Sequence, residues 1–170
     1  MTDINFSTSE PASSAARPAP SDVPIDLIEL LFFAYRDFTS DPDAALAEFG
    51  FGRAHHRVLH FVSRNPGLRV SDLLGILRIT KQSLARVLKQ LVEKQYIVQE
   101  PGASDRRERL LFATPRGQEL ALRLMRLQAK RIQAALAALP PESRDAARHF
   151  LFNMIDPDQR AEVARLIERT

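Results

Sequence analysis

Several residue types and patterns are missing from this 170-residue chain, and each absence excludes a class of site or function. There is no cysteine, which excludes disulfides, thiolate metal sites and cysteine-based redox sensing. No apolar run is long enough to cross a membrane, and the first residues lack the basic-then-apolar pattern of a secretion signal. We therefore expect a cytoplasmic protein with no membrane partner.

The sequence also lacks the common signatures of enzymes. It has no evident nucleophile–base arrangement, no glycine-rich phosphate loop and no paired carboxylates with a pocket signature. Single acids such as Glu93 and Glu108 are more simply interpreted as surface residues. We expect no enzymatic activity and no cofactor.

Acidic residues are scarce in the middle of the chain. Residues 53–131 contain 17 basic and 6 acidic side chains, a net charge of +11, whereas the rest contains 7 and 15, a net charge of −8. A basic centre between acidic ends is typical of a nucleic-acid-binding region on a scaffold that does not itself bind nucleic acid. The alternative is a solvated helical surface.

The basic excess coincides with a predicted helix over residues 80–96. Its apolar residues recur at helical spacing and form one stripe: Leu84, Val87, Leu88 and Leu91. Thr80 is a suitable N-cap. The opposite face has cations and amides but no carboxylate in its first three turns, and it carries Lys81, Gln82, Ala85, Arg86, Lys89 and Gln90. Such a face suits a polyanion, because lysine and arginine neutralise phosphates while glutamine and arginine pair with base edges.

The elements around this helix predict a winged helix-turn-helix. A short helix over residues 72–77, with Ser71 as its cap, is joined to the basic helix by a tight link. Two apolar runs, residues 97–99 and 110–113, flank a polar loop and predict a β-hairpin wing. The loop and its returning arm carry Arg106, Arg107 and Arg109. The predicted fold is mainly α with this small wing.

The remaining segments predict a helical scaffold in four parts. Residues 1–20 are rich in Ser, Ala and Pro and predict a disordered tail. Residues 21–50 contain a helix over 22–38 that is apolar nearly all round, which suggests burial against a partner subunit, and then a short helical or irregular connection. Residues 51–114 form the winged domain. Residues 115–170 predict a long helix, opened by the cap Thr114 and by Pro115, and two further helices.

Three stretches resemble the MarR family of bacterial winged-helix regulators. They are residues 70–74 (VSDLL), residues 79–91 (ITKQSLARVLKQL) and residues 105–117 (DRRERLLFATPRG). The last stretch matches the family's wing signature at Asp105, Arg107, Thr114 and Gly117. Residues 52–60 together with ITKQSLARVL are similar to the PetP-like subgroup. The two helices after Pro141 are longer than the usual single terminal helix.

The resemblance implies a homodimer that binds a palindromic DNA operator, often with relief by a small-molecule effector. Repression is expected rather than activation, since promoter occupancy suffices for it. The first and last helices of two subunits would interlock through Ile28, Leu31, Phe32, Tyr35, Phe150, Leu151 and Met154. The alternative is a winged-helix protein-interaction module without DNA readout.

The residues expected at DNA have separate roles. Four in the first half of the basic helix would reach base edges and adjoining phosphates: Lys81, Gln82, Ser83 and Arg86. Lys89 and Gln90 would meet phosphate, Arg107 with Arg106 would enter the minor groove, and Arg109 lies beside them. Asp105 would accept a hydrogen bond that shapes the wing. Ser71 and Thr80 are caps whose hydroxyls also suit phosphate.

Three histidines, His55, His56 and His60, raise the question of a metal, because His56 and His60 lie one turn apart. The sequence has no HExxH motif, and a third ligand would have to come from elsewhere. We therefore favour structural or hydrogen-bonding roles and expect no metal. A role in effector or pH response stays open.

Overall fold

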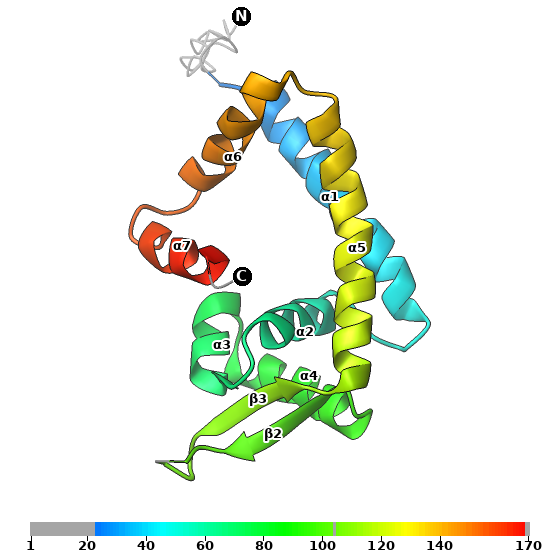
Figure 1. Ribbon diagram of the computed structural model, residues 1–170, viewed down its shortest axis with the longest axis vertical. Helices are drawn as coiled ribbons and strands as arrows, with labels where there is room; N and C mark the ends of the chain where they lie inside the picture. The colour runs from blue at the N-terminus through cyan, green and yellow to red at the C-terminus, as the bar shows by residue number, and fades with distance from the viewer. Residues whose placement is uncertain (1–22, 104, 169–170) are drawn as a thin grey trace, which may run out of the picture. The chain divides into compact units, whose positions relative to one another are not determined.

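The computed structural model of the chain describes residues 23–103 and 105–168 (Figure 1). The tail predicted over residues 1–20 lies outside the described residues. The chain divides into two units, one ending at Ala34 and one beginning at Tyr35. Its elements are α1 (Ile25–Ala47), α2 (Arg53–Arg64), β1 (Leu68–Arg69), α3 (Val70–Leu77), α4 (Lys81–Glu93), β2 (Ile97–Pro101), β3 (Arg109–Ala113), α5 (Pro115–Ala137), the 3-10 turn η2 (Pro141–Ser143), α6 (Arg144–Asn153) and α7 (Arg160–Glu168). This confirms the predicted mainly α class with a small hairpin.

Helix α1 is longer than the sequence predicts. We expected it to end at residue 38, but it continues through Pro42, which has no N–H to donate to the preceding turn. The hydroxyl of Thr39 donates to the Tyr35 carbonyl at 3.0 Å, so the side chains of this turn add bonds to its backbone. Pro42 and Leu46 are buried in the second unit. Burial of this turn therefore outweighs the tendency of Pro42 to end a helix.

The core lies in the second unit, where α2, α3, α4, the sheet and the first half of α5 meet. The predicted stripe of α4 is buried there: Leu84, Val87, Leu88 and Leu91 are at most 4% exposed. They pack with the inward faces of the other elements, including Val58, Leu59, Val62, Leu73, Tyr96, Ile97, Leu111 and Leu124. Burial of this stripe fixes which face of α4 remains outside.

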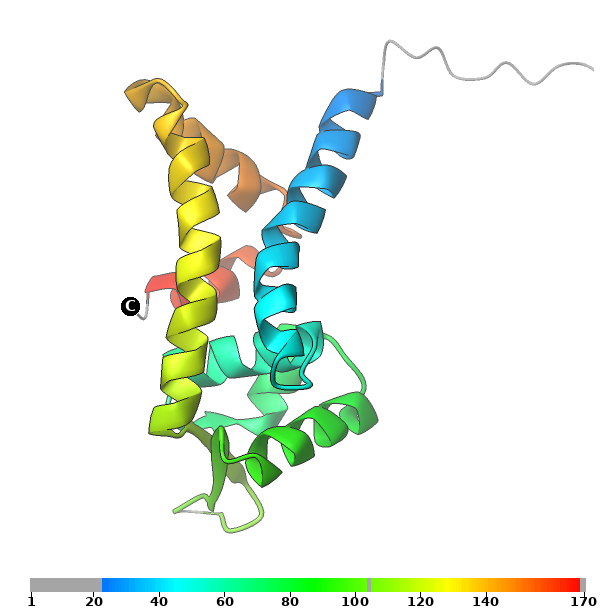
Figure 2. The ribbon, with the colours of Figure 1, turned by 90° about the vertical axis from the view of Figure 1, so that its right-hand side faces the viewer.

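The sheet has three antiparallel strands in the order β1-β3-β2. The long pairing is the hairpin, in which Ile97 lies opposite Ala113 and Pro101 opposite Arg109. The short strand β1 adds Leu68 opposite Leu111. The predicted wing and the predicted short strand are thus both present, and the hairpin and α4 lie at the same end of the second unit in both views (Figures 1 and 2).

The start of α3 corrects one expectation. We predicted Ser71 as its N-cap, but the helix begins at Val70 and its N-cap is Arg69, which makes no side-chain cap bond. The hydroxyl of Ser71 instead donates to the Asp72 carboxylate at 3.3 Å. The reason is that Arg69 pairs with Leu110 in the sheet, so the chain turns into the helix directly after the strand.

Helix α5 begins as predicted. The hydroxyl of Thr114 accepts the Gly117 N–H at 3.0 Å, and Pro115 occupies the first turn. After η2 the chain continues into α6 and α7, which match the two further helices expected. None of the helices in the described ranges is long and apolar enough to cross a membrane.

Candidate nucleic-acid interface

Thr80 caps the N-terminus of α4 with its side chain. The Thr80 hydroxyl oxygen accepts the Ser83 N–H at 3.1 Å and donates to the Ser83 hydroxyl at 2.9 Å. Ser83 is half-buried and takes part in the cap, while Lys81, Gln82, Ala85 and Arg86 are exposed. The helix therefore presents cations and amides on its outer face, as the sequence predicts.

The second half of that face is partly engaged. The ammonium of Lys89 lies 3.7 Å from the Glu93 carboxylate, an exposed pair one helical turn apart and therefore weak. The amide oxygen of Gln90 lies 2.5 Å from His55 Nε2 on α2. Both side chains remain exposed. Lys81 and Arg86 are exposed too, but the described part of the chain shows no ion pair for either of them.

The wing contains a hydrogen bond from its backbone to the Asp105 side chain. One of its carboxylate oxygens accepts the Arg107 N–H at 2.8 Å, so the predicted hydrogen bond is present. The guanidinium of Arg109 donates to the Arg106 carbonyl at 3.2 Å. Asp105, Arg106 and Arg107 are all exposed. The turn therefore holds two arginines side by side at the end of the hairpin.

A groove of about 700 Å³ joins α4 to the wing. Five of the eleven side chains predicted to contact DNA line it, namely Ser71, Lys81, Lys89, Arg107 and Arg109. The other six, which include Gln82, Arg86 and Arg106, do not line it. Asp105 and Glu108 also line it, and Glu108 pairs with Arg69 at 3.3 Å. Cations outnumber carboxylates, so the groove suits an anionic ligand.

Arg69 and Arg78 are two basic residues that the sequence reasoning did not single out. Arg69 lies on β1 and joins that strand to the wing through Glu108. Arg78 occupies the turn between α3 and α4 in a left-handed conformation, with φ of 49°, and its guanidinium lies 3.5 Å from Asp156. In the sequence, only their position beside the helix-turn-helix could have marked these two arginines as part of the site. Their ion-pair partners, Glu108 and Asp156, are distant in sequence.

The three histidines have different surroundings. His55 is stacked on Phe51 with ring centroids 4.7 Å apart, and its Nδ1 accepts the Gly52 N–H at 3.1 Å. His56 is buried, and this burial lowers its pKa. His60 lies edge-on to Phe61, and burial lowers its pKa too. Among the described residues no cluster of three metal-ligating side chains occurs.

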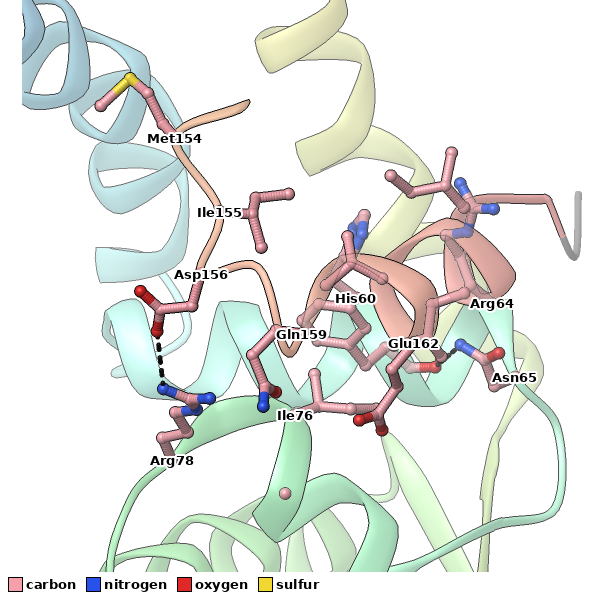
Figure 3. A pocket seen from close by; sticks show the side chains of 15 residues that line it. His60, Arg64, Asn65, Ile76, Arg78, Met154, Ile155, Asp156, Gln159 and Glu162 are labelled. Carbon is pink, nitrogen blue, oxygen red and sulfur yellow. Dashed lines mark hydrogen bonds and ion pairs between the residues drawn. The ribbon is translucent and has the colours of Figure 1, made fainter. Parts of the chain in front are cut away.

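His60 lines a second cavity of about 560 Å³ between α2, α3 and α7 (Figure 3). Its walls mix apolar side chains, such as Ile76 and Ile155, with polar ones, such as Gln159 and Glu162. The Arg78–Asp156 ion pair lies at one edge. The cavity is therefore amphipathic.

The apolar side chains predicted for dimer contact are exposed. In the first unit Ile28, Leu31 and Phe32 are 58%, 41% and 64% exposed. In the second unit the exposed members are Tyr35 on α1, Phe150 and Leu151 on α6, and Met154 directly after α6. Apolar patches of this kind mark interaction surfaces in soluble proteins.

Comparison with known proteins gives consistent results. Residues 49–108 match the model of the MarR family. The chain is 44% identical over 133 residues, covering 78% of this chain and 80% of the other, to the HTH-type transcriptional regulator PetP of Rhodobacter capsulatus. Two solved structures share the fold at lower identity. One is a MarR transcriptional regulator from Methanosarcina mazei (TM-score 0.65, 20% identity, covering 76% of this chain and 94% of that one). The other is the S. aureus MepR–DNA complex (TM-score 0.62, 19% identity, covering 78% and 96%).

Proposed function

Because this chain belongs to the MarR family of winged-helix transcriptional regulators and is PetP-like, we propose that it binds duplex DNA in a sequence-specific manner. Membership in a family of regulators also argues against enzymatic activity. The observation that carries the proposal is the groove between α4 and the wing, in which Lys81 and Lys89 of the helix lie with Arg107 and Arg109 of the wing.

In this proposal some residues of α3, α4 and the wing determine sequence specificity and others mainly add affinity. Arg86, Gln82 and Lys81 would enter the major groove, since arginine and glutamine pair bidentately with base edges. Arg106 and Arg107 would follow the adjacent minor groove, where guanidinium groups are attracted by narrow A·T tracts. Lys89, Arg109 and the Ser71 hydroxyl would bind phosphates, which set the register without reading sequence.

We also propose that the active species is a homodimer. The exposed apolar side chains Phe32, Phe150 and Leu151 would be buried against a second copy, which removes them from water. A two-fold dimer would place its two α4 helices in successive major grooves, about 34–36 Å apart, and would select a palindromic operator. Occupying a promoter in this way would repress transcription.

An effector site belongs to the same proposal. The amphipathic cavity lined by His60 and Glu162 lies against α3, the helix that precedes α4. A small molecule bound there would change the separation of the two α4 helices and weaken DNA binding without touching a base contact. If His60→Ala leaves the release of selected DNA by an active compound unchanged, this site is not the effector site.

Selection from a random duplex library tests the DNA-binding proposal directly. We expect the full-length chain to enrich a palindrome. Arg86→Ala should then cost about 1–3 kcal/mol of binding free energy and relax preference at one position of each half-site. The matched control is Arg126→Ala, at an exposed arginine that belongs to α5 and not to α4 or the wing. Equal affinity of both variants would reject base reading by Arg86, and failure to enrich any sequence would favour the protein-interaction alternative.

A further inference from the structure

His55 ties the third turn of α4 to the start of α2. Its ring lies on Phe51, its Nδ1 is 3.1 Å from the Gly52 backbone nitrogen, and its Nε2 is 2.5 Å from the Gln90 amide oxygen. Gly52 is the N-cap of α2 and His55 is the third residue of the helix, so the first contact satisfies a backbone N–H at the helix start. The imidazole thus bridges two helices.

The bridge determines the tautomer of the imidazole. A backbone N–H can only donate, so His55 Nδ1 must be the acceptor and carries no proton. In the neutral ring the proton is then on Nε2, which donates to Gln90. Gln90 must therefore present its carbonyl oxygen to the histidine. Its amide nitrogen, with two N–H donors, is left on the other branch of an exposed side chain.

We propose that His55 is a positioning residue for DNA binding, which orients the Gln90 amide so that its N–H donors face a backbone phosphate. This inference rests on the proposed function. Without His55 the side chain of Gln90 would be free to leave this rotamer and to turn its oxygen, which a phosphate repels, toward the DNA. It would then contact the phosphate only a small part of the time. Gln90 directly follows Lys89 on the outer face of α4, where a phosphate contact is expected.

The neighbouring turn of α4 is held by the same loop. The ammonium of Lys94, the C-cap of α4, donates to the Phe49 carbonyl at 2.6 Å and lies 4.8 Å from the centroid of the Phe51 ring. Gln90 and Lys94 are one helical turn apart, so residues 49–55 hold two successive turns of α4. His55 is therefore held in a fixed position relative to α4. This reduces the conformational entropy that Gln90 loses when the protein binds DNA.

The first test reads the tautomer without DNA. In a two-bond ¹H–¹⁵N spectrum of the full-length protein at pH 7.5, we expect His55 to be protonated on Nε2 and unprotonated on Nδ1. His55→Phe identifies the signal by removing it. A ring protonated on Nδ1, or an even mixture of tautomers, overturns the proposal.

The second test is a double-mutant cycle on a duplex selected by the wild-type chain. His55→Phe keeps a ring on Phe51 but removes both hydrogen bonds, and Gln90→Met keeps the length of the side chain without its polar atoms. Each should lower affinity roughly tenfold, near the lower limit for one hydrogen bond to a charged group, and the double variant should lose no more than either single one. Gln118→Met, at an exposed glutamine of α5, should change nothing.

The salt dependence of these variants separates orientation from structural damage. Removing neutral groups leaves the slope of log affinity against log salt unchanged, whereas a displaced α4 would lose cationic contacts and lower it. Additive losses, a reduced slope in His55→Phe, or full affinity in His55→Phe each refute the role. If the wild-type chain binds no duplex, the proposed function itself fails. If wild type binds but the cycle is additive, only the role of His55 fails.

Discussion

Replacing Gly117 with alanine tests how closely α5 approaches the chain that leaves α4. Gly117 is buried in the first turn of α5, and a Cβ built there would overlap the backbone carbonyl of Tyr96. A backbone atom cannot swing aside as a flexible side chain does. The start of α5 would have to move away from β2, and with it the returning arm of the wing.

The loss in the free energy of unfolding can be worked out from the contacts that such a movement breaks. The N–H of Thr114 donates to the Tyr96 carbonyl at 3.0 Å, and its hydroxyl donates to the Gln95 carbonyl at 2.8 Å. Each bond is worth about 1 kcal/mol, and overpacking typically costs about 1–3 kcal/mol. Alanine in a helix regains about 1 kcal/mol relative to glycine. We expect a net loss of about 2–4 kcal/mol, or roughly 5–15 °C in Tm for a chain of this size.

Gly75→Ala is the matched control. Gly75 lies inside α3, and a Cβ built there meets no atom within 4 Å. The same substitution should therefore stabilise the protein by about 0.5–1 kcal/mol. Urea denaturation followed by circular dichroism measures both variants. A Gly117→Ala protein as stable as wild type, or a Gly75→Ala protein that loses as much, would refute the reasoning.

Three further outcomes are expected. Burial lowers the pKa of both His56 and His60, so below about pH 6.5 the unfolded state binds more protons than the folded state. The free energy of unfolding should therefore fall as pH drops, and it should fall less in His60→Gln. Urea titrations from pH 7.5 to 5 that show no change in this free energy contradict the prediction. Asp105→Ala removes the acceptor of the Arg107 N–H, so hydrogen exchange at that amide should accelerate while overall stability changes by less than about 0.5 kcal/mol; retained protection opposes this role. Phe32→Glu places a charge on the exposed apolar face, so light scattering should show a lower mass than for wild type, whereas Arg126→Glu should not; equal masses argue against dimerisation through this face.

Local patterns predicted much of the fold. The spacing of Leu84, Val87, Leu88 and Leu91 alone indicated which side of α4 is buried, and burial confirms it. The caps Thr80 and Thr114 were also found from sequence, because capping depends on residues only three positions apart. The two runs of the hairpin were visible because short apolar runs and the turn residues between them are local signals.

Features that depend on contacts through space were not visible in the sequence. Pro42 indicates a helix end, but burial of the turn around Leu46 carries α1 past it. Ser71 is a good cap by type, yet pairing of the preceding strand with β3 sets where α3 begins. The His55–Gln90 bridge joins positions 35 residues apart, so only the packing of α2 on α4 brings them together.

The salt dependence of DNA binding tests the central claim most directly. Lys81, Arg86, Arg106 and Arg107 are exposed, and the described part of the chain places none of them in an ion pair. With the phosphate-binding Lys89 and Arg109 of each subunit, a dimer brings twelve cations to the DNA. They predict a slope of log affinity against log salt of about −11, a loss of roughly 3 × 10⁶-fold between 50 and 200 mM salt. Affinity for a selected duplex that falls log-linearly with about this slope supports the account. Affinity that is indifferent to salt, or no binding to any duplex at low salt, contradicts it.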